Sequence, residues 1–519
     1  MTKQFLLLLV VLMLCLALFS CGGDDDDDDS GNGDDGVDDD DSGDDDSSDD
    51  DDDNADDDSA DDDDAADDDD SDDDDTVPGD MVATLTDNPG CVLSCVVTWT
   101  TDEPATSWVK FGEDGEGYSL KIGDDTLTTD HEVVVVGMHA EVSYDLVAVS
   151  ETESKQTLTS QKMSFTAGSL PRYWMTGTVD VYDESKVNDG WTITNLFGKT
   201  MSNELVAAIW DMDGYVVWYY MPSGMTARAD TDVSWLADDD YVLIGPSVGK
   251  GQHPQKVDLK GDVIWEGPLQ MGNSMDDDNS MHHVFNDIGN GNIVVAFNDV
   301  RNNIVGDEIV VIDDSLNEVW TWNFWDHLTP SGGFNWTHVN SVSFDLDNDY
   351  AYISSYSLGL VFKVDMQTDN IVWEFGRNGD FGGDSSADYP WFSGSHGIDY
   401  LGDGKLLMYD NGDVARSFSR AVLYQLDENT MESTLLWEYS GENAADQWFN
   451  TSVGDADLLD NGNILICAGN GSQNQALTRY IEVTPAGEKV WQMWTYNQGQ
   501  TTIGSFQVDR MPALAQPID

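Results

Sequence analysis

One pattern recurs from about residue 172 to the end of the chain, and it constrains the fold more than any other feature. A strand is followed by an Asp, Gly or Asn turn, and the next strand ends in an aliphatic residue and tryptophan. A second type of hairpin, such as "HHVFNDIGNGNIVVAF", alternates with the first and turns at Asp-Asp, Asn-Gly, Asn-Asp or Asp-Gly. The final tryptophans, 47 to 64 residues apart, are Trp218, Trp265, Trp320, Trp373, Trp437 and Trp491.

Two hairpins per period make a four-stranded sheet, and one such sheet cannot bury both of its faces. Six sheets stacked radially cover one another and leave few free edges. The repeat therefore predicts an all-β chain with a six-bladed β-propeller over residues 171–519. The first copy of the second hairpin is degenerate near "WTITNLFG", which predicts that N- and C-terminal strands share a blade. We expect the tryptophans to pack between blades.

Residues 77–170 form a separate predicted domain of short alternating strands, among them "CVVTWTT", "SWVKFG" and "HEVVVVGM". The segment "GMHAEVSYDLVAVS" resembles the corner of a fibronectin type III or immunoglobulin-like β-sandwich, in which Tyr144 would bond back to the backbone. The region holds no cluster of charged or nucleophilic residues. We expect a spacer or packing module ahead of the propeller.

The N-terminus predicts export. Residues 1–20 contain an apolar run after Lys3 that is typical of a signal peptide, and the run ends in "LFSC", which looks like a bacterial lipobox. That resemblance implies cleavage before Cys21, acylation of Cys21 and a lipid anchor in the outer membrane, on its periplasmic side or at the cell surface. A plain secretory signal is the alternative. Residues 21–76 then predict an extended, disordered tether.

Acidic residues dominate the charge of the chain. Residues 24–75 contain 35 of the 102 Asp and Glu, and the remainder still outnumber the 21 Lys and Arg threefold. Such an excess of negative charge argues against nucleic acid and anionic lipid as partners. Contact with a membrane is therefore expected only through the lipid anchor.

The cysteines give no metal signature. Cys91 and Cys95 lie four residues apart and could close a small loop as a disulfide. Cys467 in "NILICAG" reads as a buried thiol on a strand. No zinc site is predicted.

Histidine is rare, with eight residues in the chain, yet three of the eight start hairpins of the second type. His283 and His396 each lie eight residues before a turn glycine, and His338 starts its hairpin with three extra residues. Because the innermost strand of a propeller blade starts at the central channel, we expect the three imidazoles to meet in one axial pocket. His282, next to His283, could contribute from the rim.

Three imidazoles in one pocket allow several kinds of chemistry. They could bind a metal ion, for which imidazole is a good ligand. They could bind an oxyanion, or one could act as a nucleophile while the others hold the transferred group. Composition and spacing leave these alternatives open.

Residues 172–512 resemble the bacterial arylsulfate sulfotransferases, which use no adenylyl-sulfate cofactor. The matching motifs, in order, are "HHVFNDIGNGNIVV", "FNWTHVNSVSFDLDNDYAYISS", "SHGIDYLGDGKLLMYDNG" and "GDADLLDNGNILI". The resemblance implies a six-bladed propeller behind a small β-sandwich, no cofactor, and a ping-pong reaction. A phenolic sulfate gives its sulfuryl group to a histidine, and a second phenol takes it. The alternative is a non-catalytic cell-surface propeller that binds a ligand or partner.

The resemblance also implies roles for individual residues. The histidine of the "H…DG…YDNG" motif, the family's nucleophile, is His396, and His283 and His338 would ligate sulfate oxygens. The family's arginine after "SS" is replaced by Tyr356, and its Asp after the "HH" pair by Val284. A guanidinium near the "YDNG" motif, from Arg416 or Arg420, could compensate for the missing arginine. The residues expected to contact substrate are Tyr356, His282, Arg420 and Asn411.

Overall fold

We describe a computed structural model of the chain. It places residues 80–170, 175–198, 206–221, 233–236, 241–244, 254–267, 281–330, 333–469, 478–497 and 503–518. The predicted signal peptide, the lipid-bearing Cys21 and the tether lie outside these residues, so they stay predictions. None of the helices in the described ranges is long and apolar enough to cross a membrane.

The N-terminal region forms one seven-stranded sheet with the strand order β33-β3-β2-β4-β5, to which β1 adds on β2 and β6 on β4. The long strand β2 pairs with β1 in its first part and with β4 in its last, and its register against β3 shifts between Thr100 and Ala105. The strands are β1 (Ala83–Asp87), β2 (Cys95–Glu113), β3 (Leu120–Val135), β4 (Ser143–Glu151), β5 (Thr157–Thr159), β6 (Met163–Thr166) and β33 (Gln516–Pro517).

Two details of this region answer the sequence predictions. The backbone N–H of His139 donates to the Tyr144 hydroxyl at 3.0 Å, which confirms the expected bond from this tyrosine back to the main chain. Cys91 and Cys95, by contrast, are free buried thiols and not the possible disulfide. Burial raises the pKa of the Cys91 thiol to about 11 and that of Cys95 to about 12, so both are protonated at neutral pH.

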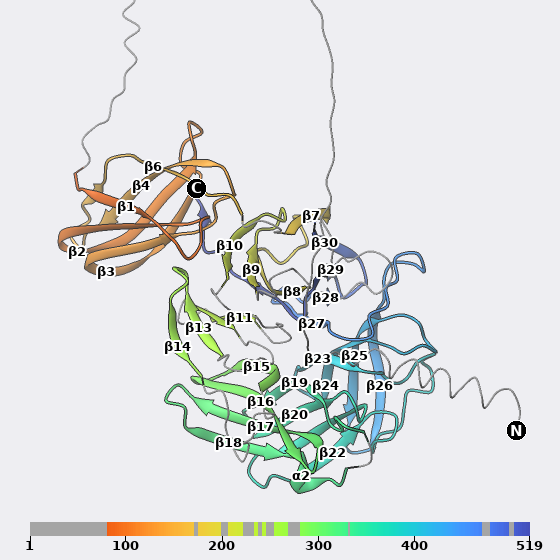
Figure 1. Cartoon of the computed structure of the whole chain (residues 1–519). Coiled ribbons are helices and arrows are strands. Elements are labelled where there is room, and N and C mark those ends of the chain that lie inside the picture. The colour runs from red at the N-terminus through yellow and green to blue at the C-terminus, as the bar shows by residue number, and fades with distance from the viewer. Residues whose placement is uncertain are drawn as a thin grey trace, which may run out of the picture. The chain divides into compact units, whose positions relative to one another are not determined.

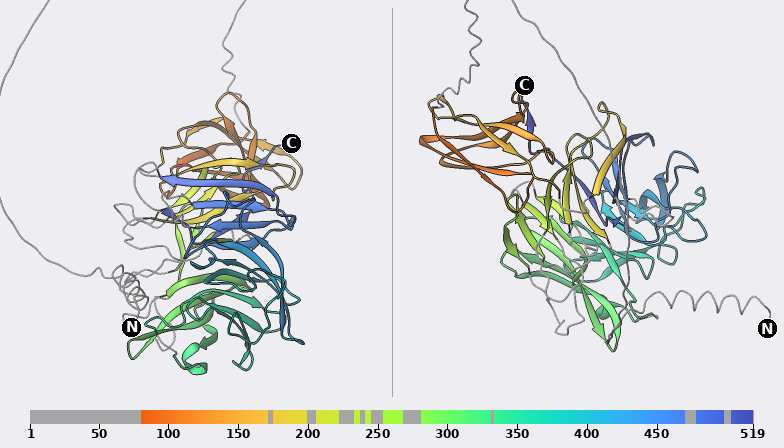
Figure 2. Two further views of the ribbon diagram at one scale, coloured as in Figure 1. Left: turned by 90° about the vertical axis from the view of Figure 1, so that its right-hand side faces the viewer. Right: turned by 45° about the horizontal axis from the view of Figure 1, so that its top comes forward.

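Most of the remaining described residues lie in six sheets of four or five strands, in a propeller-like arrangement (Figures 1 and 2). Four of the six sheets are simple four-stranded meanders, as two hairpins per period predict. Their strands are β11 (Val233–Leu236), β12 (Tyr241–Ile244), β13 (Gln255–Asp258), β14 (Val263–Glu266); β15 (Met281–Gly289), β16 (Asn292–Arg301), β17 (Ile304–Asp313), β18 (Glu318–Asn323); β19 (Val339–Asp345), β20 (Tyr350–Ser355), β21 (Leu360–Asp365), β22 (Ile371–Phe375); and β23 (Ser395–Tyr400), β24 (Lys405–Asp410), β25 (Arg420–Asp427), β26 (Glu432–Tyr439). A short helix, α2 (Phe324–His327), follows β18.

The first and last sheets combine strands from distant parts of the chain. In the first sheet, the C-terminal β31 and β32 pair with β8; in the last, the early strand β7 pairs with β30. This confirms that the "WTITNLFG" segment, which is β8, shares its sheet with C-terminal strands. The strands are β8 (Trp191–Gly198), β9 (Val206–Trp210), β10 (Val216–Tyr220), β31 (Ile503–Gly504), β32 (Val508–Met511); and β27 (Asp455–Leu458), β28 (Ile464–Ala468), β29 (Thr478–Val483), β30 (Lys489–Asn497), β7 (Met175–Tyr182).

The repeated tryptophans join neighbouring sheets, as predicted. Each of four indole N–H groups donates to the outer turn of the following sheet: Trp218 to Leu259 O, Trp265 to Asp314 O, Trp320 to Asp369 Oδ1, and Trp491 to Met212 O. The last of these connects the sixth sheet to the first. A buried indole with a hydrogen-bond partner combines a large apolar area with a directional contact.

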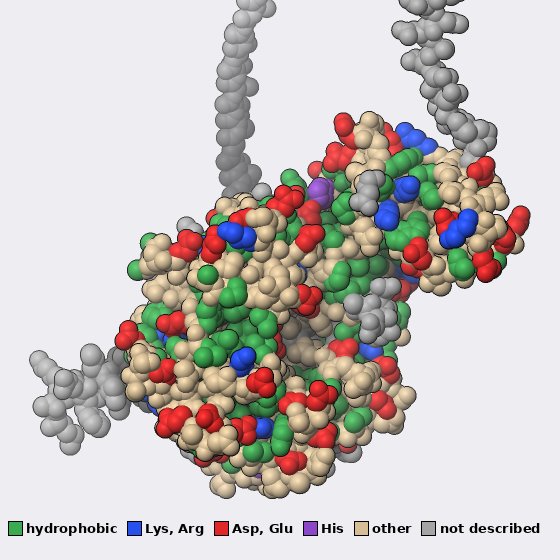
Figure 3. Space-filling model, turned by 180° about the vertical axis from the view of Figure 1, so that it is seen from behind, with side chains coloured by type: hydrophobic (Ala, Val, Ile, Leu, Met, Phe, Trp, Pro, Cys, Tyr) green, Lys and Arg blue, Asp and Glu red, His purple; other side chains and the backbone are tan. Residues whose placement is uncertain are grey.

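Acidic side chains are spread over the face seen in Figure 3, with few lysines and arginines among them. Many carboxylates of the described residues stabilise turns: Asp211, in the loop "DMDGY", accepts from the backbone N–H groups of Asp213 and Tyr215 at 3.1 and 2.9 Å. Asx turns of this kind explain the Asp-rich loops without a bound cation.

Candidate active site

Six aromatic side chains from four of the sheets meet where the inner strands begin. His283 lies 5.0 Å from His338 between ring centroids, and His338 lies 5.5 Å from Tyr356. Tyr356 in turn lies 5.6 Å from His396. The members of this group, which we call the histidine cluster, are His282, His283, His338, Tyr356, His396 and Phe506. The structure thus brings together all four histidines that the sequence singled out.

His396 is held by both of its ring nitrogens. Nδ1 lies 2.6 Å from Asn411 Oδ1, while Nε2 accepts from the backbone N–H of Val453 at 3.3 Å. The Asn411 amide nitrogen is already committed, because it donates to the carbonyls of Asn450 and Val453 at 3.0 and 2.8 Å. Asn411 can therefore offer only its oxygen, which places the proton of His396 on Nδ1 and the lone pair on Nε2.

The loop that carries Asn411 is fixed by a buried charged network. Asp410 accepts from Arg416 Nη2 at 2.6 Å and from Arg420 Nε at 2.9 Å. Arg420 also donates to Glu438 and to the carbonyls of Tyr389 and Trp391. Its side chain has no exposed surface. The predicted substrate contact of Arg420 is therefore wrong for this conformation, since every nitrogen of its guanidinium already has an internal partner.

Two cluster histidines have unusual backbone conformations. His283 and His338 adopt the left-handed region, with φ of 55° and 48°, which costs about 1 kcal/mol or more for a non-glycine residue. The matching left-handed residue of the next sheet is Gly397, with φ of 46°. A Cβ at 397 would lie 1.9 Å from Asp455 Oδ1, so only glycine fits there.

These backbone conformations correct one detail of the match between His283 and His396 that the count of residues from the turn glycines predicted. Counting from the turn glycines placed His396 opposite His283, but the left-handed position falls on His283, His338 and Gly397. His396 directly precedes this position, as His282 does. The inner strand β15 has an additional register shift between Asp287 and Gly289, close to its turn, which β23 lacks, and a count back from the turn includes that extra residue.

The imidazoles of His396 and His338 are kept neutral. Burial, joined for His338 by the neighbouring His282, lowers the pKa of both rings to about 4. A neutral imidazole keeps one unprotonated nitrogen, which a nucleophile requires. His338 Nδ1 lies 2.8 Å from Asn335 Nδ2, so its own proton is on Nε2.

Two members of the site were not found from the sequence. Phe506, from the C-terminal segment, stacks on His283 with centroids 5.3 Å apart and meets His396 edge-on at 5.6 Å. Asp307, on β17, has no exposed surface and accepts from His282 Nε2 at 2.9 Å. Phe506 lies beyond the last repeat, and Asp307 lies within the apolar run "IVGDEIVVID", so neither belongs to a histidine motif.

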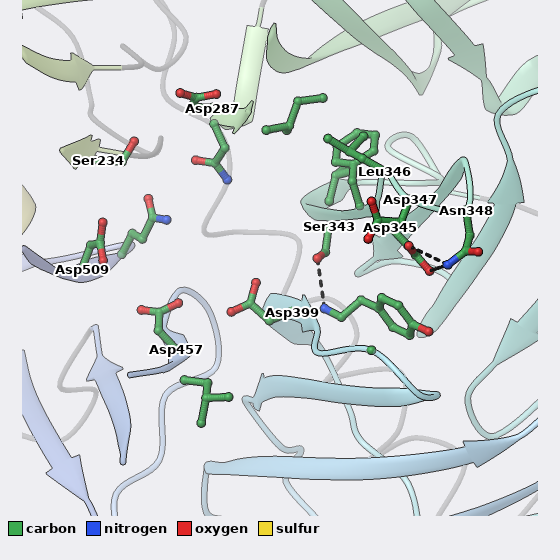
Figure 4. Close-up of a pocket in the computed structure, with 18 of the residues that line it drawn as sticks. Ser234, Asp287, Ser343, Asp345, Leu346, Asp347, Asn348, Asp399, Asp457 and Asp509 are labelled. Carbon is green, nitrogen blue, oxygen red and sulfur yellow. Dashed lines mark hydrogen bonds between the residues drawn. The ribbon is translucent and has the colours of Figure 1, made fainter. Parts of the chain in front are cut away.

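A large acidic cavity lies further along the same inner strands. Its volume is about 980 Å³, and its lining includes Asn286, Ser343, Asp399, Asp457 and Asp509. Figure 4 shows the three carboxylates around one opening. Such a lining repels anions, so this end of the strands is unsuited to a sulfate ester. Within the described residues, no group of three or more His, Cys, Asp or Glu is arranged to hold a metal ion.

Two carboxylates of this cavity should make stability depend on pH. Burial raises the pKa of both Asp399 and Asp509 to about 6, and the Asp399 charge adds to the effect on Asp509. The folded state therefore binds more protons than the unfolded state between about pH 4 and 6, and stability falls as the pH rises through this window. We expect Asp399→Asn to raise the melting temperature at pH 8 by roughly 2–4 °C and to change it little at pH 4.5, by scanning fluorimetry.

Asp403→Asn is the matched control, because Asp403 lines the same cavity with an exposed side chain. It should leave both melting temperatures unchanged. A lower melting temperature of Asp399→Asn at pH 8 would mean that the carboxylate stabilises the cavity.

The fold and the site define a β-propeller-like protein with a buried histidine cluster where its inner strands begin. A family model described as Arylsulfotransferase (ASST) matches residues 148–506, more than half of the chain. The chain therefore belongs to the arylsulfotransferase family. Membership assigns it to enzymes of sulfuryl transfer, with small aryl molecules as donor and acceptor.

Several solved structures match the chain at low similarity. A protein of unknown function from Bacteroides caccae matches with 13% identity and a TM-score of 0.42, over 62% of this chain and 100% of its own. The WD40 domain of Toxoplasma gondii coronin matches with 10% identity and a TM-score of 0.34, over 66% and 75%. A luciferin-regenerating enzyme matches with 9% identity and a TM-score of 0.33, over 65% and 98%. No curated protein matches the chain.

Proposed function

We propose that the chain transfers a sulfuryl group from a phenolic sulfate ester to a phenolic acceptor through a sulfohistidine at His396. The observation that carries this proposal is the bonding of His396, with Asn411 on Nδ1 and the lone pair on Nε2. In the first half-reaction Nε2 attacks sulfur, and the S–O bond to the aryl group breaks with its electron pair on the phenolate oxygen. In the second, the acceptor oxygen attacks sulfur and the N–S bond pair returns to Nε2.

The rest of the cluster suits an anionic sulfuryl group. Its charge is spread over three oxygens, and fixed hydrogen-bond donors stabilise such charge in the transition state. His338 presents an Nε2–H, because its Nδ1 is taken by Asn335. Asn411 stabilises the positive charge that the His396 ring gains on sulfation, since its amide oxygen accepts a hydrogen bond from the Nδ1–H group.

The test uses the wild-type protein and a donor alone. Incubation with 4-nitrophenyl sulfate should release one nitrophenol per chain in a burst and leave a protein heavier by one SO₃ group. Peptide mapping should place the group on His396. Adding a phenol should discharge the adduct and restore turnover. Neither a burst nor an adduct with any of several aryl sulfates would overturn the proposal.

A second candidate function is a propeller that binds an aryl sulfate without turning it over. Tyr356 favours it, because a neutral hydroxyl stands where the family has an arginine, and this hydroxyl already donates to the Thr451 carbonyl at 3.1 Å. Removing one such donor costs on the order of 10²–10³-fold in rate in other enzymes. Calorimetric binding of 4-nitrophenyl sulfate without any adduct would favour this second candidate.

We further infer that the six sheets close into a six-bladed propeller behind a fibronectin-like sandwich over residues 77–170. Contacts between inner strands support the ring, since they run in a series from β11 through β15, β19, β23 and β27 to β32 and back to β11. The Tyr144 bond supports the sandwich. An experimental structure with an open ring would contradict this inference.

A further inference from the structure

A buried carboxylate links two sheets at the histidine cluster. Asp307 Oδ1 accepts from His282 Nε2 at 2.9 Å, within the same sheet. Oδ2 accepts from Thr337 Oγ1 at 2.6 Å and from the backbone N–H of Val339 at 2.7 Å; Val339 begins β19 of the next sheet, and Thr337 lies two residues before it. Thr337 and Val339 flank His338, so one side chain holds both His282 and the strained turn that presents His338.

Asp307 remains ionised although it is fully buried. Burial alone would raise the pKa of its carboxyl group, but His282 and the donors of Thr337 and Val339 hold this pKa below the usual range. A buried carboxylate with three donors is a fixed negative charge beside an imidazole. The titratable groups packed around His282 are Asp307, His283 and His338.

The bond to Asp307 also decides which nitrogen of His282 can act. Because the carboxylate accepts a hydrogen bond from the Nε2–H group, Nδ1 is the nitrogen available to the other cluster rings. His283 and His338 lie 5.2 and 6.4 Å away between ring centroids. A carboxylate that fixes the tautomer of an imidazole and balances its charge on protonation is a recurrent arrangement in acid–base catalysis.

We propose that Asp307 is a positioning residue that sets His282 to exchange a proton with the phenol oxygen through Nδ1. The proposal rests on the proposed sulfuryl transfer. When the S–O bond breaks, protonated His282 gives its Nδ1 proton to the leaving phenolate and becomes neutral. When the acceptor phenol attacks, its O–H proton passes to His282 Nδ1, so His282 regains its proton in each cycle. The carboxylate of Asp307 stays ionised throughout.

The test compares donors that differ in their need for a proton. Nitrophenolate is a good leaving group without protonation, whereas the phenolate of 4-methylphenyl sulfate is not. Single-turnover sulfation of Asp307→Asn should fall on the order of 10²-fold with 4-methylphenyl sulfate and less than tenfold with 4-nitrophenyl sulfate. Glu308→Gln is the control; it removes the adjacent buried carboxylate of β17, and it should slow both donors equally or not at all.

His282→Gln covers the case in which Asp307→Asn does not fold, since a Gln amide can donate to Asp307 but cannot carry the proton. It should show the same preference for the good leaving group. Equal losses with both donors in the folded variants would overturn the role of Asp307 while leaving sulfuryl transfer intact. Absence of transfer by the wild-type protein with either donor would instead overturn the proposed function itself.

Discussion

His396→Ala should lose sulfuryl transfer by roughly 10⁴-fold or more in kcat, the scale of nucleophile removal in other enzymes with covalent intermediates. The substitution deletes the Nε2 lone pair that we expect to attack sulfur. His338, the other cluster imidazole whose tautomer an amide fixes, carries its proton on Nε2 instead. Turnover of 4-nitrophenyl sulfate with a phenol acceptor measures the loss. Intact mass after incubation with donor alone should show no added SO₃.

The control is His327→Ala. His327 lies at the end of α2, is exposed, and stacks on Trp322 at 4.8 Å, outside the cluster. Its removal should leave turnover within about twofold of the wild type, because surface changes seldom disturb a distant site. If His396→Ala retained wild-type turnover, the covalent intermediate would have to form on another residue.

Asn411→Ala should reduce kcat on the order of 10²-fold or more while His396 remains in place. Without the amide oxygen, the imidazole can take the other tautomer and turn, as happens when the orienting residue of a catalytic histidine is changed. The carbonyls of Asn450 and Val453 would also lose their shared donor. Single-turnover sulfation by 4-nitrophenyl sulfate measures the chemical step directly.

Asn443→Ala is the matched asparagine control, since Asn443 is exposed and stabilises only a surface turn. Melting temperatures of both variants should be recorded, because a buried amide also contributes to stability. A folded Asn411→Ala protein with unchanged single-turnover rate would show that the tautomer of His396 does not limit the reaction.

The repeat predicted much of the architecture. Tryptophan at the end of each outer hairpin and polar turns at fixed spacing led to four-stranded meanders, and the structure contains them. The same repeat brought His283, His338 and His396 together, because the inner strands of neighbouring sheets begin close to one another. A pattern of this kind specifies position along a strand well, since the spacing is set by backbone geometry.

Other parts of the site could not be predicted from the repeat in the sequence. An irregularity near the turn of β15, absent from β23, displaced the count by one position and aligned His396 with the left-handed His283, and a count of residues does not reveal such a bulge. Asp307 reaches the cluster from the third strand of its sheet, where its sequence neighbours indicate only a buried strand. The positive charge of Arg420 suggested a sulfate ligand. In the structure its side chain is buried and pairs with Asp410, so Arg420 stabilises the fold.

Phe506 belongs to the segment that ends in β32, whose pairing with β8 joins the two ends of the repeat region. A chain emerging from the ribosome makes the four histidines well before it makes this segment. The cluster thus needs a segment that is made after all of its histidines, since residues 503–511 pair beside β8 and bring the phenylalanine ring against His283 and His396. A chain that stopped before this segment would have its imidazoles but would lack this aromatic contact.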